Sequence, residues 1–240
     1  MEKEMLNLNK RTVTAIILAA GNSTRFGKNR NKNFERINGK SVLSYSLKTF
    51  DENKYVDNII IAAKEIEKKE IKNIILEEHI KKNTKIIVGG NTRSESVYNC
   101  IRATDSDIVI IQDGARPFIK QEYIDKCIEN MNYYKGVTVG VKSKDTIKLA
   151  NESNIVVSTT KRNNTWIIQT PQCFIRDILL KEYEKYKNED VTDDCEILEK
   201  GNYKIKIIKG DYTNIKITTY EDLDIVKKFL EYVPNQHTSV

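Results

Sequence analysis

The chain has 240 residues, and its 40 Lys and Arg against 34 Asp and Glu give a net charge of +6. This length fits one large domain with an excursion as well as it fits two domains. The charged fraction is 31%, and the 39% of hydrophobic residues fall in periodic clusters, which excludes a disordered chain. No apolar run approaches the roughly 20 residues of a membrane span, so we expect no membrane contact.

Cysteine usage and charge pattern exclude further classes. Four cysteines without a C-x-x-C pair and only two histidines disfavour zinc sites, disulfide scaffolds and histidine-centred catalysis. Lys and Glu alternate through residues 64–82 as on a solvated helix face, and no basic stripe carries interleaved aromatic residues. We therefore expect no nucleic-acid partner. The N-terminal residues do not have the pattern of a signal peptide, which favours a reducing cytoplasm.

The first half of the chain alternates strand-length apolar runs with helical periods. The runs predict strands at residues 13–18, 59–63, 85–88 and 107–112. The helical periods predict four helices, with apolar faces at Val42, Leu43, Leu47 and Phe50; at Ile66, Ile71, Ile74 and Ile75; at Val97, Cys100 and Ile101; and at Ile124, Cys127, Ile128 and Met131. Thr92 and Glu95 form a capping-box pattern at the start of the third helix.

The regular alternation of predicted strands and helices stops in the second half of the chain. Strands predicted at residues 137–141, 155–160 and 166–169 have no helix between them, so we expect a β-excursion that projects as an arm. Helices resume at residues 176–186 and after Thr192. The chain then ends with a predicted strand pair at residues 204–209 and 214–218 and a helix with Leu223, Val226, Phe229 and Leu230 on one side.

These elements predict an α/β fold with a doubly wound, mostly parallel sheet. We expect a single domain over residues 13–234, with the arm at about residues 137–172. Residues 1–12 and 235–240 are predicted tails.

Ligands in such sheets bind outside the carboxyl ends of the parallel strands. The polar residues at those ends lie in 21–32, in 89–96, in 113–116 and at Lys216. This mixture of glycines and cations with one carboxylate suits a polyphosphate, because bare main-chain amides and positive side chains bind phosphate oxygens.

The loop after the first strand matches neither common nucleotide motif. It is not a Walker A loop, because five residues separate Gly21 from Gly27 and no Ser or Thr follows Lys28. It also lacks the G-x-G-x-x-G fingerprint of dinucleotide-binding enzymes. Gly21 alone fits an ordinary turn, but Arg25 and Lys32 beyond the strand end favour phosphate binding.

Asp113 follows the most apolar strand and has two interpretations. Its carboxylate could bind a metal–phosphate complex or a sugar hydroxyl, or it could cap the next turn and pair with Arg116. Similarly, Asp193 and Glu196 could form only a helix capping box.

Eight motifs in order resemble a known family. They are Ala19-Ala20-Gly21 through Arg25; Asn31-Lys32; Gly89-Gly90-x-x-Arg93-x-x-Ser96-Val97; Asp113-Gly114-Ala115-Arg116-Pro117; Lys144-Asp145-Thr146-Ile147-Lys148; Trp166-x-x-Gln169-Thr170-Pro171-Gln172-x-Phe174; Thr192-Asp193-Asp194; and Tyr212-Thr213-Asn214-Ile215-Lys216-Ile217-Thr218. Together they resemble the 2-C-methyl-D-erythritol 4-phosphate cytidylyltransferases of the non-mevalonate isoprenoid pathway, from about residue 13 to residue 230. The first motif is shared by many nucleotidyltransferases, so the specificity lies in the ordered set.

The resemblance implies a Rossmann-like nucleotidyltransferase fold and a reaction of CTP with methylerythritol phosphate that releases pyrophosphate. It implies Mg²⁺ as cofactor, held mainly by phosphates, with Asp113 as a candidate protein ligand. The residues implied as catalytic are Arg25, Lys32, Arg162 and Lys216. Those implied for the nucleotide are Ala19, Ala20, Gly21, Gly90, Asn91, Arg93 and Ser96. Those implied for the polyol phosphate are Asp113, Arg116, Thr146, Thr170 and Thr192. The family exchanges its arm between subunits, which implies a homodimer in which Arg162 acts in the partner's site.

Four positions depart from the usual family pattern. Asn31-Lys32-Asn33 stands where Pro-Lys-Gln is common, and Lys28 is a nearby competitor for the lysine role. Gln112 stands for a usual His, and Asn91 for a usual Asp. The rival interpretations are a ribitol 5-phosphate cytidylyltransferase and a non-catalytic sugar-nucleotide-binding protein. Gly114 and the Asp193-Asp194 pair resemble the methylerythritol enzyme more closely than the ribitol enzyme.

Overall fold

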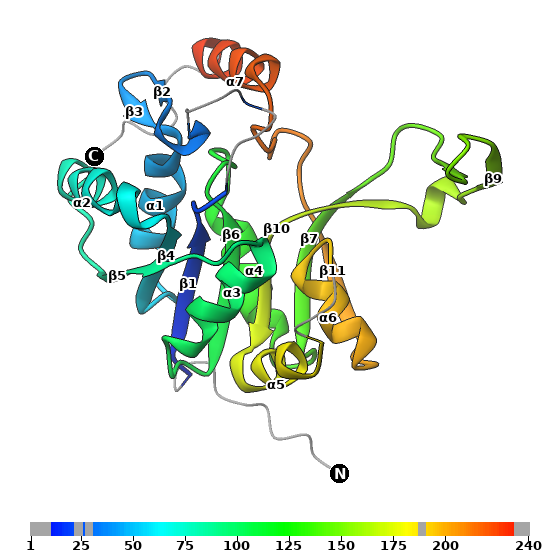
Figure 1. Ribbon diagram of the computed structural model, residues 1–240, viewed down its shortest axis with the longest axis horizontal. Helices are drawn as coiled ribbons and strands as arrows, with labels where there is room; N and C mark the ends of the chain where they lie inside the picture. The colour runs from blue at the N-terminus through cyan, green and yellow to red at the C-terminus, as the bar shows by residue number, and fades with distance from the viewer. Residues whose placement is uncertain (1–10, 22–25, 27–30, 187–190, 233–240) are drawn as a thin grey trace.

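The computed structural model describes residues 11–21, 26, 31–186 and 191–232. A seven-stranded sheet forms its centre, in the order β11-β7-β10-β6-β1-β4-β5 (Figure 1). Its strands are β1 (Val13–Leu18), β4 (Asn58–Ala63), β5 (Asn83–Val88), β6 (Ile108–Asp113), β7 (Gly136–Lys142), β10 (Trp166–Ile175) and β11 (Ile205–Lys209). Only β10 runs antiparallel to its neighbours β6 and β7, so the predicted mostly parallel sheet is confirmed.

The described residues form seven α-helices, of which all but the last in the chain cover the two faces of this sheet. They are α1 (Val42–Glu52), α2 (Lys68–Glu77), α3 (Arg93–Arg102), α4 (Gln121–Asn130), α5 (Arg176–Tyr186), α6 (Asp194–Lys200) and α7 (Tyr220–Tyr232), with short 3-10 helices η3 (Lys32–Phe34), η4 (Glu65–Glu67) and η5 (Arg162–Asn164). Alternate residues of β1 enter different cores: Ile17 packs with α1, α2 and α4, whereas Ile16 packs with α3, α5 and α6. Burial on both faces explains why this strand is apolar throughout.

A third, smaller core lies under α7. It joins Phe26, Ala115 and Ile217 to Leu223 and Val226 of the helix. Three segments with predicted site residues therefore share one apolar cluster, which fixes their relative positions.

The β-excursion is shorter than the sequence predicts. Residues 137–142 and 166–172 belong to β7 and β10 of the central sheet, because these strands pair with each other. Only the segment between them projects, as a hairpin of β8 (Lys148–Ala150) and β9 (Val156–Thr159) that extends away from the body in Figure 1.

Two predicted elements differ in the structure. Residues 214–218 form no strand; the Ile217 amide instead donates to the Ala115 carbonyl at 2.9 Å. Ile66 lies in η4 rather than in the second helix and is 88% exposed. A small hairpin of β2 (Arg36–Ile37) and β3 (Lys40–Ser41), absent from the sequence prediction, precedes α1. Within the described ranges, no helix has the length and apolar character needed to cross a membrane.

Candidate active site

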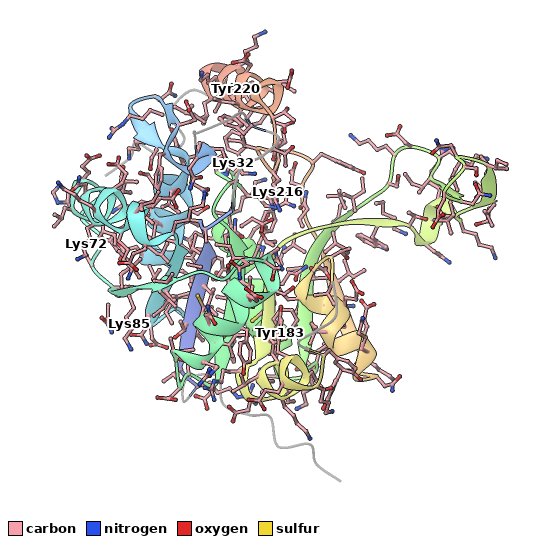
Figure 2. All side chains as sticks on the ribbon, in the orientation of Figure 1. Lys32, Lys72, Lys85, Tyr183, Lys216 and Tyr220 are labelled. Carbon is pink, nitrogen blue, oxygen red and sulfur yellow. The ribbon has the colours of Figure 1, made fainter. Side chains whose placement is uncertain are left out.

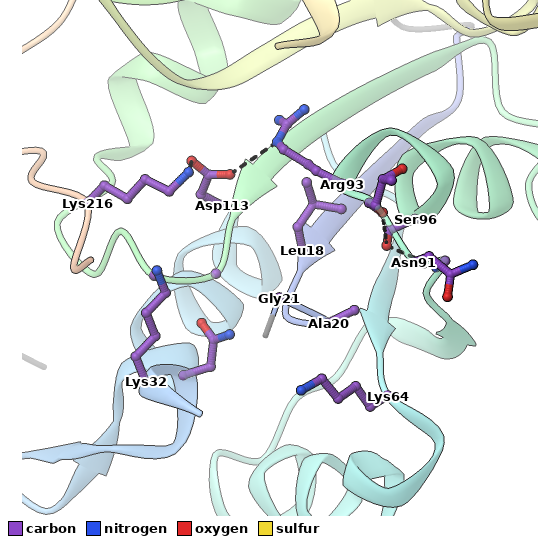
Figure 3. Close-up of a pocket in the computed structure, with 15 residues that line it drawn as sticks. Leu18, Ala20, Gly21, Lys32, Lys64, Asn91, Arg93, Ser96, Asp113 and Lys216 are labelled. Atoms are coloured by element: carbon purple, nitrogen blue, oxygen red, sulfur yellow. Dashed lines mark hydrogen bonds and ion pairs between the residues drawn. The ribbon is translucent and has the colours of Figure 1, made fainter. Parts of the chain in front are cut away.

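A cavity of about 610 Å³ opens at the carboxyl ends of β1, β4, β5 and β6 (Figure 3). It is lined by Leu18, Ala20, Gly21, Lys32, Asn33, Lys64, Gly90, Asn91, Thr92, Arg93, Ser96, Asp113, Gly114, Ala115 and Lys216. The sequence prediction that residues at these strand ends converge is confirmed for the segments that follow β1, β5 and β6 and for Lys32 and Lys216.

The loops after β1 and β5 touch each other at this cavity. A Cβ on Gly89 would lie 2.5 Å from the Cβ of Ala20, and a Cβ on Gly90 would lie 2.1 Å from that of Glu95. No side chain fits at either glycine, so the main chain itself forms this part of the wall. Such bare backbone allows close approach of a ligand.

Asn31 and Asn33 hold the turn that carries Lys32. The Asn31 Oδ1 accepts from the Asn33 amide at 3.0 Å, and its Nδ2 donates to the Ala19 carbonyl at 3.1 Å and to Glu67 Oε1 at 2.9 Å. The Asn33 Nδ2 donates to the same Ala19 carbonyl at 3.2 Å. These bonds tie the turn to the end of β1. The departure from Pro-Lys-Gln therefore introduces specific hydrogen bonds, and Lys32 lines the cavity.

The start of α3 shows half of the predicted capping box. Thr92 Oγ1 accepts from the Glu95 amide at 3.0 Å, as predicted, but the Glu95 carboxylate accepts from the Asn91 amide at 2.6 Å rather than from Thr92. The Gly90 amide donates to Ser96 Oγ at 3.0 Å. The amides of Gly90 and Asn91 thus already donate hydrogen bonds within the chain, so a ligand that contacts them would share these donors.

Asp113 ends β6 and is surrounded by three cations. Its Oδ2 lies 2.8 Å from Lys216 Nζ and 3.5 Å from Arg116 Nε, and its Oδ1 lies 3.7 Å from Arg93 Nε. Lys216 and Arg93 approach this carboxylate from opposite sides in Figure 3. Burial alone would raise the pKa of Asp113, but the charges of Lys216, Arg93 and Arg116 together hold it well below its usual range. Asp113 is therefore a carboxylate at neutral pH.

Arg93 bridges two carboxylates. Its Nη2 donates to Asp194 Oδ2 at 2.7 Å, and Tyr183 donates its hydroxyl to Asp194 Oδ1 at 2.6 Å. Asp194 is completely buried, and Tyr183 is almost so. The resemblance assigns Arg93 to the nucleotide, and Arg93 does line the cavity. Its guanidinium, however, connects Asp113 to the start of α6, which is a positioning contact.

Thr170 and Arg116 lie behind Asp113. The Asp113 amide donates to Thr170 Oγ1 at 3.1 Å. Arg116 Nη1 donates to the Asn214 carbonyl at 2.7 Å, and Asn214 Nδ2 donates to the Thr170 carbonyl at 2.9 Å. Neither Thr170 nor Arg116 lines the cavity. Both instead fix the carboxylate and the segment before Lys216.

Other predicted residues lie elsewhere. Arg162 Nη2 donates a hydrogen bond to Thr146 Oγ1 at 3.0 Å on the segment that projects between β7 and β10, and neither residue lines the cavity of its own chain. Thr192 is exposed, and both its amide and its hydroxyl donate to the Glu196 carboxylate. These hydrogen bonds stabilise the start of α6. The Asp193 side chain caps that helix by accepting from the Glu196 amide, as the capping interpretation predicts.

Two predicted cations, Arg25 and Lys28, lie outside the described residues. Ala19 is buried and contributes its carbonyl to the Asn31 and Asn33 side chains rather than a surface to the cavity.

The sequence prediction missed two polar residues that line the cavity, Asn33 and Lys64. Lys64 directly follows β4, so the rule that ligands bind at carboxyl strand ends could have found it. Asn33 carried no comparable signal, because its place depends on the fold of the turn after Asn31.

The cavity does not fit a resident metal ion held by the protein. In the part of the chain that the structure describes, no group of three or more His, Cys, Asp and Glu side chains is placed to hold a metal ion. Both oxygens of Asp113 already face cations, which would repel a divalent ion. The candidate metal role of Asp113 thus receives no support from its surroundings.

Comparisons with known proteins agree on one family. The family model described as IspD, 2-C-methyl-D-erythritol 4-phosphate cytidylyltransferase, matches residues 13–232. The 2-C-methyl-D-erythritol 4-phosphate cytidylyltransferase of Caldanaerobacter subterraneus subsp. tengcongensis is 44% identical over 91% of this chain and 98% of its own length. That of Clostridium beijerinckii is 40% identical over 92% and 99%, respectively.

A solved structure shows the same relation. The 4-diphosphocytidyl-2C-methyl-D-erythritol synthase of Anaerococcus prevotii superposes with a TM-score of 0.84 at 32% identity, over 93% of this chain and 98% of that one. With the cavity, its cations and the ordered motifs, these matches establish that the chain belongs to the IspD family of 2-C-methyl-D-erythritol 4-phosphate cytidylyltransferases.

Proposed function

We propose that the chain transfers a cytidylyl group from CTP to 2-C-methyl-D-erythritol 4-phosphate, giving 4-diphosphocytidyl-2-C-methyl-D-erythritol and pyrophosphate. A phosphate oxygen of the acceptor attacks the α-phosphorus of CTP, and the bond from that phosphorus to the leaving pyrophosphate breaks in line. The observation that carries this proposal is the cavity itself, where Lys32 and the Asp113–Lys216 pair meet bare backbone at one sheet edge in a chain of this family.

The residues present suit a reaction without a protein nucleophile. A phosphate monoester is already anionic at neutral pH, so the site must bring two anions together rather than remove a proton. Positioning and electrostatic stabilisation supply that requirement. In our proposal Lys32 and Arg25 stabilise charge on the α-phosphoryl group, and Gly21 with its neighbours contacts the triphosphate.

The acceptor is proposed to bind beside Lys216. In the structure Lys216 is paired with Asp113, so the ammonium can meet an acceptor phosphate while the carboxylate accepts from a polyol hydroxyl. Cytosine is assigned to the wall formed by Gly90, Asn91 and Ser96, since all three line the cavity next to Ala20.

Magnesium is proposed to enter with CTP, as part of the substrate. The described residues offer no set of ligands of their own, whereas triphosphate oxygens are good ligands for this ion. We propose no metal contact from Asp113. A requirement for Mg²⁺ then reflects the charge state of the nucleotide.

We propose that the active form is a homodimer with exchanged arms. Arg162 and Thr146 lie together on the segment that projects between β7 and β10, and neither lines the cavity of its own chain. The hairpin also exposes Leu149, Val156 and Val157 at 54%, 56% and 69%, respectively, an apolar surface suited to a second copy. Mixing inactive Lys32→Ala with inactive Arg162→Ala subunits should then restore some activity. Absence of any complementation would contradict the exchange.

A cytoplasmic location also fits, since the four cysteines are buried and unpaired.

The central experiment is a turnover assay with two acceptors. Purified protein should release pyrophosphate from CTP and Mg²⁺ with methylerythritol phosphate. Ribitol 5-phosphate, under the same conditions, should give little product. Lys32→Ala should lower kcat by about 10²–10³, the usual loss for one charge-stabilising donor, while the melting temperature stays unchanged. Equal turnover of ribitol phosphate, or wild-type rates in Lys32→Ala, would contradict the proposal.

A further inference from the structure

Lys64 is a cavity cation that the motifs of this chain leave without a role. It follows the last residue of β4 and lines the cavity between the loops that end β1 and β5. In Figure 3 its ammonium end points into the space beside Ala20 and Gly21, on the side where Lys32 stands. Its placement is therefore comparable to that of the cations already assigned.

Among the described residues, the Lys64 ammonium forms no ion pair. Lys216 is paired with Asp113 at 2.8 Å, and Arg93 with Asp194 at 2.7 Å. An ammonium without an ion-pair partner at the wall of a polar cavity attracts an anion, and the attraction strengthens when a ligand displaces water.

The main chain of Lys64 is held firmly. Its amide donates to Glu67 Oε2 at 3.3 Å, and its carbonyl accepts from the Glu67 amide at 3.0 Å. The other oxygen of that carboxylate, Glu67 Oε1, accepts from Asn31 Nδ2 at 2.9 Å. Since Asn31 also caps the turn of Lys32, one carboxylate links the turns that carry both lysines. The turns that carry the two lysines are thus held beside the same cavity by one small network.

We propose that Lys64 is a further nucleotide-binding residue, whose ammonium contacts phosphate oxygens of CTP. The inference rests on the proposed function of this cavity, and it adds the Lys64 ammonium at the end of β4 to the groups that bind the nucleotide. Lys64 adds binding energy for the substrate, while Lys32 remains the cation assigned to the reacting phosphoryl group.

Calorimetric titration of the full-length protein with CTP and Mg²⁺ tests this inference. Lys64→Gln should weaken the binding of CTP about 5- to 10-fold, the loss expected for one charge-assisted contact at a partly exposed site. Lys64→Arg should keep most of the affinity, and Lys64→Glu should bind more weakly than Lys64→Gln. Lys72→Gln is the matched control, because Lys72 is exposed on α2 and does not line the cavity (Figure 2).

Titrations with CMP and with cytidine identify the group that is contacted. The ratio of wild-type to Lys64→Gln affinity should fall from CTP to CMP and reach about one for cytidine, because cytidine has no phosphate. Unchanged CTP affinity in Lys64→Gln, or an equal loss for cytidine, would overturn the inference. Failure of the proposed function has a different signature, namely wild-type protein that binds no CTP or makes no cytidylyl product.

Discussion

Replacing Asp113 by Asn tests how the cations of the cavity are held. The substitution keeps the shape of the side chain but removes the charge that faces Lys216, Arg116 and Arg93 at 2.8, 3.5 and 3.7 Å. Removing one partner of a buried ion pair usually costs about 3–5 kcal/mol, because the remaining charge stays buried.

The structure places the expected cost at or below the lower limit of that range. The Lys216 side chain is 37% exposed and can turn toward water. Arg93 retains Asp194, and Arg116 retains the Asn214 carbonyl. We therefore expect the free energy of unfolding to fall by about 2–3 kcal/mol. For a chain of this size that corresponds to a melting temperature about 4–12 °C lower.

Thermal unfolding at several pH values between about 5 and 8, with and without CTP and Mg²⁺, measures this loss. The nucleotide should stabilise Asp113→Asn at least as much as the wild type, since it supplies negative charge to the same cations. The pKa of Asp113 lies below that of an unfolded Asp, about 3.9. Its contribution is therefore complete above that pH and is lost as the pH falls through the folded-state pKa. An unchanged melting temperature, or a difference from wild type that varies between about pH 5 and 8, would refute this account.

Two further substitutions and one labelling experiment test positioning and burial. Glu67→Ala removes the bond to Asn31, so kcat should fall about 3- to 10-fold through a displaced Lys32, whereas rates equal to wild type would exclude that link. Tyr220→Ala removes the ring stacked on Phe26 at 4.2 Å and should lower the unfolding free energy by about 1 kcal/mol, while Tyr220→Phe should not. A thiol reagent at pH 8 should label none of the four buried cysteines before unfolding, since burial raises their pKa values; rapid labelling would contradict it.

The sequence predicted the central sheet well where burial is complete. β1 and β6 are enclosed on both faces, so their residues are apolar almost throughout and their positions can be read directly. The prediction of a strand at residues 214–218 was wrong because burial also shaped the sequence pattern there. The alternation of Ile with polar residues has the period of a strand, but Ile217 enters the small core under α7 while Lys216 turns to Asp113. Period alone does not distinguish these two causes of alternation.

The sequence predicts those parts of the site that depend only on where a residue stands relative to a strand. Gly21 and Gly90 follow parallel strands of the sheet and Asp113 ends one, so their convergence follows from topology. The bond between Arg93 and Asp194 joins residues 101 positions apart, so its existence depends on how α6 packs against α3. Sequence spacing carries no information about such a contact.

A crystal structure with CTP and Mg²⁺ tests the central claim most directly. We predict a triphosphate within hydrogen-bond distance of Lys32 and a cytosine ring against Gly90 and Ser96. Nucleotide density outside this cavity, for example in the one lined by Thr14 and Asn58 at the opposite ends of the strands, would contradict the account.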